Sequence, residues 1–244
     1  MKKMQPKHPY KEAPEMNPEG LVVIGQPKAD VLYADPAWDI NQRGKFGAIN
    51  HYDLMPLEDI KRMPVSSLCK ENAACFLWIV GGPDGRKAGE EVMKAWGFRL
   101  VDDIVAIKFH LGLGVYSRHA YENCLVGIKG KMPVDYKGQP NWIIFPKQDH
   151  SHKPEEMYEV IERMYKNRIY FELFARQRHK HPDWYIWGNE AEGGSDIYIP
   201  GYPVPEYSDK VHFAKEGDLE AGFESDIFTD ADMEAEHPSQ EGGK

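Results

Sequence analysis

The tetrapeptide Asp35-Pro36-Ala37-Trp38 places an acid, a rigid turn residue and an aromatic ring directly after the strand-like run Asp30 to Ala34. Ligands of open α/β sheets bind at strand ends, because side chains that leave the sheet there converge on a crevice. There the Asp35 carboxylate and a backbone carbonyl of Asp35 or Pro36 could each accept one hydrogen from the amine of a flipped-out adenine, while Trp38 stacks on the base. Two such acceptors would localise the amine lone pair for methyl transfer. Taken alone, the tetrapeptide is more often a turn beside a core aromatic.

Three further motifs follow along the chain: Ser151-His152-Lys153-Pro154-Glu155, Phe171-Glu172-Leu173-Phe174-Ala175-Arg176 and Trp187-Gly188-Asn189-Glu190. In this order and at these intervals the four motifs resemble the Asp-Pro-Pro-Trp class of S-adenosylmethionine-dependent N6-adenine methyltransferases. This is the family of the catalytic subunit of the messenger-RNA adenosine methyltransferase, with many bacterial and phage DNA-modifying members. The resemblance runs from Ala29 to Glu190 and includes Phe76-Leu77-Trp78 and the run from Asn123 to Gly130.

This resemblance implies S-adenosylmethionine as the cofactor and roles for individual residues. The catalytic residues would be Asp35, Pro36, Ala37 and Trp38. The cofactor would contact Asp35, Lys153 at its methionine carboxylate, Arg176 and Asn189 on its ribose side, Glu172 and Glu190. Asn189 after Gly188 could equally be a turn residue. Glu172 lies inside an apolar run, where an unpaired carboxylate is costly, so we expect Arg176 or the cofactor as its partner.

The chain departs from the family pattern at three positions. Ala37 stands where the family has a second proline. Because alanine can adopt the dihedral angles of proline, we expect weaker preorganisation of the turn rather than lost activity. Arg178 replaces a family histidine, and Glu190 stands where the family often has glutamine.

Two loops and one basic run are candidates for contact with nucleic acid. Basic and aromatic residues interleave in Asp39 to Met55 and in His110 to Glu122, which suits a nucleic-acid strand and a mobile gate, although many surface loops look the same. The basic run from Arg176 to His181 is equally typical of a solvated loop. The predicted substrate-binding residues are Trp38, Tyr52, Tyr116, Arg118, His119, Arg178 and Lys180.

The composition is that of one domain with an uneven distribution of charge. The 244 residues are 41% hydrophobic, enough to bury one core. From Glu206 onward there are 12 acidic residues and 3 lysines, so the net charge of -9 lies in this segment and the remainder is neutral. Bulk charge therefore does not exclude nucleic acid as the substrate.

Cysteines and hydropathy indicate the compartment. The three cysteines cannot all pair, and their apolar neighbours predict reduced, buried thiols. No segment reaches the apolar length of a membrane span. We expect a soluble protein of a bacterial or phage-infected cytoplasm; a homodimer is compatible with the sequence. The pairs His150 with His152 and His179 with His181 would suit zinc, but no cysteine pair stands at ligand spacing, so we expect no metal.

Alternating strand-like and helical segments predict a Rossmann-like α/β fold with a mainly parallel twisted sheet and helices on both faces. The expected strands are Asp30 to Ala34, Ala74 to Val80, Asp103 to Phe109, Asn123 to Ile128, Ile169 to Phe174 and Trp184 to Trp187. The expected helices are Leu57 to Met63, Arg86 to Trp96 and Pro154 to Tyr165. The catalytic motif precedes the cofactor motif, which resembles the permuted order of the β-type amino-methyltransferases.

The predicted domain organisation has three parts. Residues 1–27 would be partly ordered, 28–200 would form the methyltransferase domain, and 201–244 an acidic flexible tail, dispensable for chemistry from Glu206 onward. The Pro-, Gly- and acid-rich composition that begins after Gly194 already favours an extended tail from that residue. The alternative is that Tyr202, Tyr207 and Phe213 pack on the core.

The function favoured by the sequence is methylation of adenine N6 in nucleic acid, with DNA preferred over RNA. The alternatives are an RNA N6-adenosine methyltransferase and a catalytically weak nucleic-acid-binding scaffold of the same fold. Such scaffolds tend to lose the catalytic acid or aromatic, and this chain has Asp35 and Trp38. Methylation of a cytosine amine or of a protein glutamine is disfavoured, because related enzymes for those substrates have Ser or Asn in place of Asp35.

Overall fold

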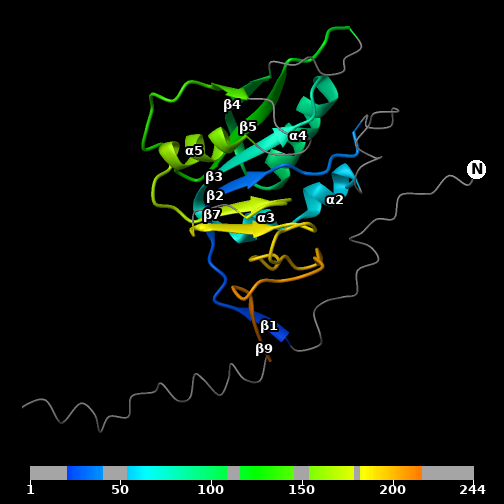
Figure 1. The fold of residues 1–244 in the computed structure, drawn as a ribbon, viewed down its shortest axis with the longest axis vertical. Helices are drawn as coiled ribbons and strands as arrows, with labels where there is room; N and C mark the ends of the chain where they lie inside the picture. Colours follow the sequence, from blue (N-terminus) through cyan, green and yellow to red (C-terminus); the bar gives the residue numbers. More distant parts are fainter. Residues whose placement is uncertain (1–20, 41–53, 109–115, 146–153, 179–181, 216–244) are drawn as a thin grey trace, which may run out of the picture.

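A computed structural model describes residues 21–40, 54–108, 116–145, 154–178 and 182–215. Its main element is a seven-stranded sheet of order β6-β4-β5-β3-β2-β7-β8 (Figure 1). Within these residues, β5 is the only strand of the sheet that runs antiparallel to its neighbours. The strands of this sheet are β2 (Ala29–Ala34), β3 (Cys69–Ile79), β4 (Arg99–Lys108), β5 (Tyr121–Lys129), β6 (Trp142–Phe145), β7 (Tyr170–Leu173) and β8 (Trp184–Trp187).

Helices cover both faces of the sheet, as the alternating pattern predicted. Successive residues of β2 enter different cores, with Leu32 in one and Tyr33 in the other. The first core contains residues of α2 (Leu57–Arg62), α3 (Val65–Leu68) and α4 (Pro83–Ala95), and the second contains residues of α5 (Glu155–Met164). The central strands are therefore buried on both sides, which explains their nearly continuous apolar runs.

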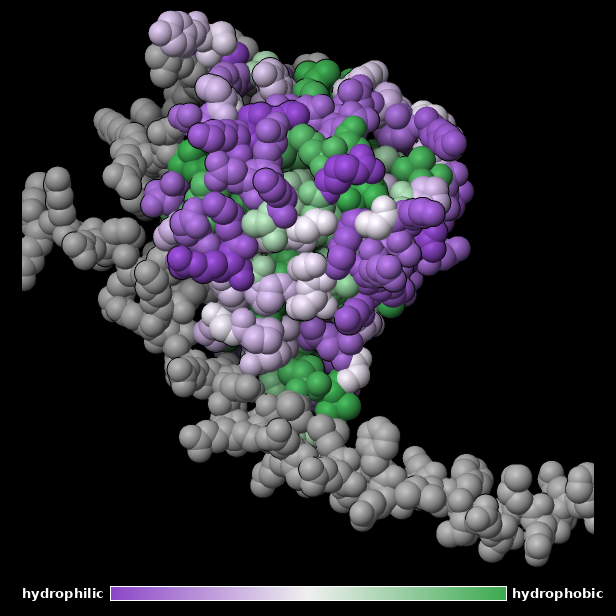
Figure 2. Space-filling view, turned by 180° about the vertical axis from the view of Figure 1, so that it is seen from behind, coloured by the Kyte–Doolittle hydropathy of each residue, from purple (hydrophilic) through white to green (hydrophobic). Residues whose placement is uncertain are grey.

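All the strands and helices that the sequence predicted are present, with bounds shifted by a few residues. Among the described residues, four elements were not predicted: α3, β6, β1 (Leu21–Ile24) and β9 (His212–Lys215). The last two pair with each other in an antiparallel ribbon separate from the main sheet. Hydrophobic residues gather at this end of the described surface when the molecule is seen from behind (Figure 2), and Ile24 of β1 is among the exposed ones.

The expectation of an extended tail from residue 201 is wrong for residues 201–215. Together with residues 195–200 they form an ordered segment, here called the C-terminal strap (residues 195–215). Its Ile197, Ile199 and Val204 are buried in the first core, and the Tyr202 hydroxyl donates to the Asp59 carbonyl over 2.8 Å. The sequence-based alternative, that the aromatics of this segment pack on the core, is thus correct for Tyr202 and Tyr207. Phe213 packs on Tyr198 and Tyr207, and residues 216–244 lie outside the described residues.

The cysteines are free and buried, as expected. Burial raises the pKa of the Cys69 thiol to about 12, so this thiol is protonated at neutral pH. In the part of the chain that the structure describes, no helix combines the length and apolar character that crossing a bilayer demands.

Candidate active site

Four parallel strands end at one edge of the sheet and bring the sequence motifs together there. Ala34 at the end of β2 pairs with Leu77 on one side and Leu173 on the other, and Leu173 pairs with Trp187 of β8. The segments after these strands therefore leave the sheet side by side. They are Asp35–Trp38 after β2, Val80–Gly82 after β3, Phe174–Arg178 after β7 and Gly188–Glu190 after β8.

The Asp35-Pro36-Ala37-Trp38 segment forms a tight turn. The Trp38 N–H donates to the Pro36 carbonyl over 2.9 Å, and the Met55 N–H donates to the Ala37 carbonyl over 2.7 Å. The Asp35 side chain is half-buried at this turn. A carbonyl oxygen has two lone pairs, so the Pro36 carbonyl can accept a second hydrogen bond beside the one from Trp38. The turn thus holds a half-buried carboxylate and a backbone acceptor at the strand end, and it forms with alanine at residue 37.

Trp38 is part of the core in this structure. Its side chain is 5% exposed, and its indole N–H donates to the Trp78 carbonyl over 3.1 Å. A parallel bridge between Trp38 and Met55 fixes the same residue from the backbone side. The indole therefore anchors the turn that carries Asp35, while its stacking on a target base stays a prediction.

Glu172 has a partner that the sequence did not reveal. The carboxylate is 4% exposed, and the Tyr158 hydroxyl of α5 lies 3.0 Å from each of its oxygens. Burial, followed by the Glu172 charge, raises the pKa of Tyr158 far above its ordinary value, so the hydroxyl keeps its proton and donates. Arg176, the side-chain partner we expected for Glu172, instead forms an ion pair with Glu190 over 3.3 Å.

The β7 and β8 ends approach each other closely. Phe174 has a positive φ of 65°, which costs a non-glycine residue about 1 to 2 kcal/mol. The turn at Phe174 lets the Ala175 N–H donate to the Trp187 carbonyl over 2.9 Å. A Cβ on Gly188 would lie 2.2 Å from the Ala175 carbonyl oxygen, so only glycine fits there. Backbone strain and close approach thus coincide where the cofactor motifs meet.

The other residues predicted at the cofactor or substrate occupy varied positions. Asn189 and Glu190 are exposed after β8. The Arg178 guanidinium, for which a substrate contact was predicted, donates to Asp196 over 2.6 Å and to the Gly194 carbonyl over 3.0 Å. Sequence reasoning overlooked Asp196 and its neighbour Ser195, because they lie in a segment interpreted as tail. Lys153, Tyr52 and Lys180 lie outside the described residues, as do the four histidines considered for zinc.

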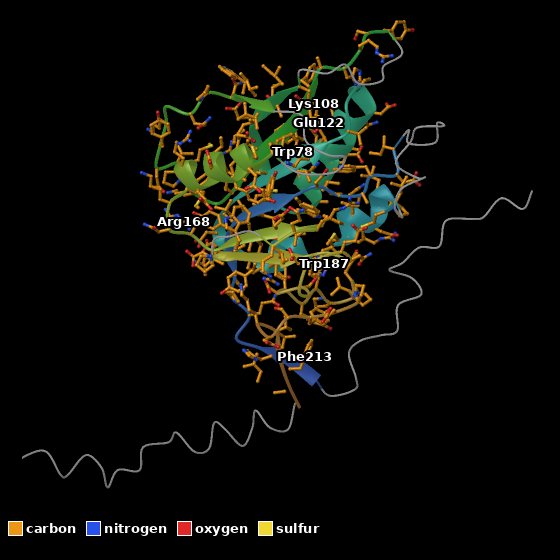
Figure 3. All side chains as sticks on the ribbon, viewed as in Figure 1. Trp78, Lys108, Glu122, Arg168, Trp187 and Phe213 are labelled. Carbon is orange, nitrogen blue, oxygen red and sulfur yellow. The ribbon has the colours of Figure 1, made fainter. Side chains whose placement is uncertain are left out.

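The loop between β4 and β5 approaches the same edge. His119 is exposed and lies close to Gly81, which follows β3. A Cβ atom placed on Gly81 would lie 3.0 Å from the His119 Nδ1 atom. At the base of this loop the Lys108 N–H donates to the Ala120 carbonyl over 2.7 Å, and the Lys108 ammonium pairs with Glu122 (Figure 3). Tyr116 and Arg118, on the same loop, are exposed. The predicted substrate residue His119 is thus brought to the end of β3, the strand that pairs with β2.

The polar groups at this edge fit S-adenosylmethionine, which carries an ammonium, a carboxylate and a ribose diol. The half-buried Asp35 carboxylate suits the ammonium, while the Asn189 amide and the Arg176–Glu190 pair offer donors and acceptors to hydroxyl groups. Within the described residues, no cluster of His, Cys, Asp and Glu could hold a metal ion.

Comparison with known sequences identifies the family. The profile of the MT-A70 family matches residues 29–190, more than half of the sequence. The chain belongs to the MT-A70 family. The resemblance seen in the sequence motifs is thereby confirmed, over the same residues. MT-A70 proteins are N6-adenine methyltransferases and relatives of these enzymes, and membership implies use of S-adenosylmethionine.

Relatives of this MT-A70 chain are much longer proteins. It is 31% identical over 174 residues to a putative N(6)-adenosine-methyltransferase MT-A70-like of Medicago truncatula, covering 68% of this chain and 27% of the relative. It is 30% identical over 175 residues to the N(6)-adenosine-methyltransferase catalytic subunit METTL3 of Homo sapiens, covering 68% and 29%. The N6-adenosine-methyltransferase non-catalytic subunit MTB of Arabidopsis thaliana matches at 30% identity over 113 residues, covering 42% and 14%. The chain therefore spans less than a third of these relatives.

Proposed function

We propose that this protein transfers a methyl group from S-adenosylmethionine to N6 of adenine in nucleic acid. The observation that carries the proposal is the register of β2 and β7, in which Ala34 pairs with Leu173. This pairing places the Asp35 turn directly beside the Phe174–Arg178 segment. An adenine at the turn and a cofactor at the β7 and β8 ends would then be neighbours.

The chemistry follows from the acceptors of the turn. When bound, the cofactor supplies an electrophilic methyl group. The Asp35 carboxylate and the second lone pair of the Pro36 carbonyl would each bind one hydrogen of the adenine amine, which localises the nitrogen lone pair toward the methyl group. Asp35 is then the acceptor at hand for the proton that the amine loses. Trp38 holds this turn in place through its bond to Trp78.

RNA is the first substrate to test. Adenosine, which the names of the relatives specify, is a ribonucleoside, and this supports the RNA alternative better than the preference for DNA that the sequence suggested. None of the described residues separates the two substrates. A methylation assay on RNA and DNA oligonucleotides of matched sequence, read by mass spectrometry of the nucleosides, compares them directly.

The test of the reaction is Asp35→Ala with Asp39→Asn as its control. Asp39→Asn removes a carboxylate from the same segment but outside the tetrapeptide. We expect the wild type and the control to form N6-methyladenine. Asp35→Ala should form none, while its free energy of unfolding without cofactor stays that of the wild type. Methylation that persists in Asp35→Ala would overturn the role of Asp35. A folded wild type that neither binds S-adenosylmethionine nor methylates either nucleic acid would overturn the proposed enzymatic activity.

A nucleic-acid-binding scaffold is the second candidate, supported by the match to the non-catalytic subunit MTB. It predicts nucleic-acid binding without cofactor binding. Calorimetry with S-adenosylmethionine and its demethylated product separates the two functions.

A further inference from the structure

Ser195 and Asp196 of the C-terminal strap are buried polar residues that contact the ends of β7 and β8. Both lie beyond the residues that match the MT-A70 family. The relative exposure of Ser195 is 0% and that of Asp196 is 2%. Buried polar groups are retained where their hydrogen bonds are satisfied, so their partners indicate what they hold.

Ser195 holds the turn after β8. Its Oγ accepts the Gly188 N–H over 3.1 Å and donates to the Gly188 carbonyl over 3.2 Å. The Ser195 backbone is itself fixed by the strap: its N–H donates to the Glu206 carbonyl and its carbonyl accepts the Ser208 N–H, each over 2.9 Å. Gly188 immediately precedes Asn189, a residue predicted at the cofactor. Residues 206–208 thus fix a side chain that fixes the β8 end.

Asp196 holds the segment after β7. One carboxylate oxygen accepts from Arg178 over 2.6 Å and from the Ile186 N–H over 3.2 Å. The other oxygen accepts from the Ser208 hydroxyl over 2.5 Å. Burial favours the neutral acid, but the bonds from Arg178, Ser208 and Ile186 outweigh it and lower the pKa of Asp196. The carboxylate is therefore ionised at neutral pH and binds the guanidinium through a charge-assisted bond.

Arg178 connects the two loops. Besides Asp196, its guanidinium donates to the Glu192 carbonyl over 3.3 Å and to the Gly194 carbonyl over 3.0 Å. The Glu192 N–H in turn donates to the Arg176 carbonyl over 3.2 Å. One guanidinium thereby joins the segment after β7 to the turn that follows β8.

We propose that Ser195 and Asp196 are positioning residues of the cofactor site, which hold Phe174–Arg178 and Gly188–Glu190 in a fixed relation. The role of these loops in binding S-adenosylmethionine rests on the proposed function. That Ser195 and Asp196 fix the two loops rests only on the hydrogen bonds described above. The strap is thus a working part of the site, although it lies outside the family match.

The experiment compares Asp196→Asn and Ser195→Ala with the control Tyr202→Phe. The control removes the strap's hydroxyl bond to the Asp59 carbonyl of α2, a contact that involves neither the segment after β7 nor the turn after β8. Calorimetry measures the Kd for S-adenosylmethionine, and hydrogen–deuterium exchange measures opening of peptides spanning 173–178 and 187–192. We expect the Kd to rise about tenfold in both test variants, as for the loss of one buried charge-assisted or paired hydrogen bond, with faster exchange in these peptides. Tyr202→Phe should change neither.

The two readouts separate the possible failures. A wild type that does not bind the cofactor would contradict the proposed function. The comparison of hydrogen–deuterium exchange rates would still decide whether Ser195 and Asp196 fix the two loops. Unchanged exchange in folded Asp196→Asn and Ser195→Ala would overturn the positioning role. If Asp196→Asn does not fold, Ser208→Ala is used in its place, because it removes a single hydrogen bond to the Asp196 carboxylate. An equal rise in Kd for Tyr202→Phe would show general loosening of the strap and would also overturn the proposal.

Discussion

Trp38→Phe tests whether the indole anchors the turn that carries Asp35. The pairing of β2 with β3 ends at Ala34 and Leu77, and the indole N–H supplies a donor to the next carbonyl along β3, that of Trp78. Phenylalanine keeps an aromatic face but has no N–H. Loss of this buried hydrogen bond costs about 0.5 to 1.5 kcal/mol, and the smaller ring in a site that is 5% exposed adds about 1 kcal/mol.

We therefore expect the free energy of unfolding to fall by about 1.5 to 2.5 kcal/mol, measured by urea denaturation with an unchanged m value. Trp142→Phe on β6, where the side chain is 49% exposed, is the matched control and should stay within about 0.5 kcal/mol of the wild type. Methylation per folded molecule should also fall, because the turn loses its anchor. A Trp38→Phe protein as stable as the Trp142→Phe control would refute the anchoring role. Normal stability with weaker nucleic-acid binding in Trp38→Ala would instead support pure stacking.

Three further predictions follow from the buried polar groups and the strap. Tyr158→Phe removes the donor to both Glu172 oxygens and should lower the unfolding free energy by about 1.5 to 3 kcal/mol in urea denaturation. Because the pKa of Asp196 is lowered in the folded state, its contribution to stability is complete above about pH 4, the ordinary range of Asp, and is lost as the pH falls through the lower folded value. Melting temperatures across pH should show this loss in the wild type but not in Asp196→Asn. Truncation after Lys215 removes ten acidic residues and one lysine, and should leave stability unchanged but tighten binding to random-sequence nucleic acid at low salt, whereas truncation after Pro205 should destabilise the domain.

Each of these has a contradicting result. Tyr158→Phe with wild-type stability would show that Glu172 does not depend on the hydroxyl. If the melting temperatures of the wild type and Asp196→Asn change with pH in parallel, Asp196 does not contribute to the loss of stability in acid. Equal affinities of full-length and Lys215-truncated protein at every salt concentration would exclude an electrostatic restraint by the acidic segment, and a stable Pro205 truncation would make the strap dispensable.

The meeting of the motifs at one sheet edge was predictable because it follows from local patterns. Apolar runs predicted β2 and β7, and parallel strands between helices must end at the same edge, so Asp35 and the segment after Leu173 were expected together. The role of Trp38 was not decided in this way, because an aromatic after a turn suits both a stacking platform and a core.

The partners of the buried carboxylates could not be predicted, because they come from distant segments. Tyr158 is one apolar-face residue of a helix, and no local pattern specifies that its hydroxyl reaches Glu172. The strap was misjudged on composition: its prolines, glycines and acids outweighed the alternation of Ile197 and Ile199, both of which are buried. That two-residue alternation was the available signal for an ordered segment.

The pairing of β1 with β9 joins the first and last strands that the structure describes. During synthesis, β9 is therefore the last of these strands to leave the ribosome, so the ribbon cannot form until nearly all of the ordered chain has been made. Closing so long a loop is entropically costly compared with the local pairings of the sheet. We expect the central sheet to form first and the ribbon to dock last, as a separately opening unit. A nascent chain stopped before β9 would then carry the Asp35 turn together with Ser195, Asp196 and Ser208, but would lack the partner that closes the ribbon on β1.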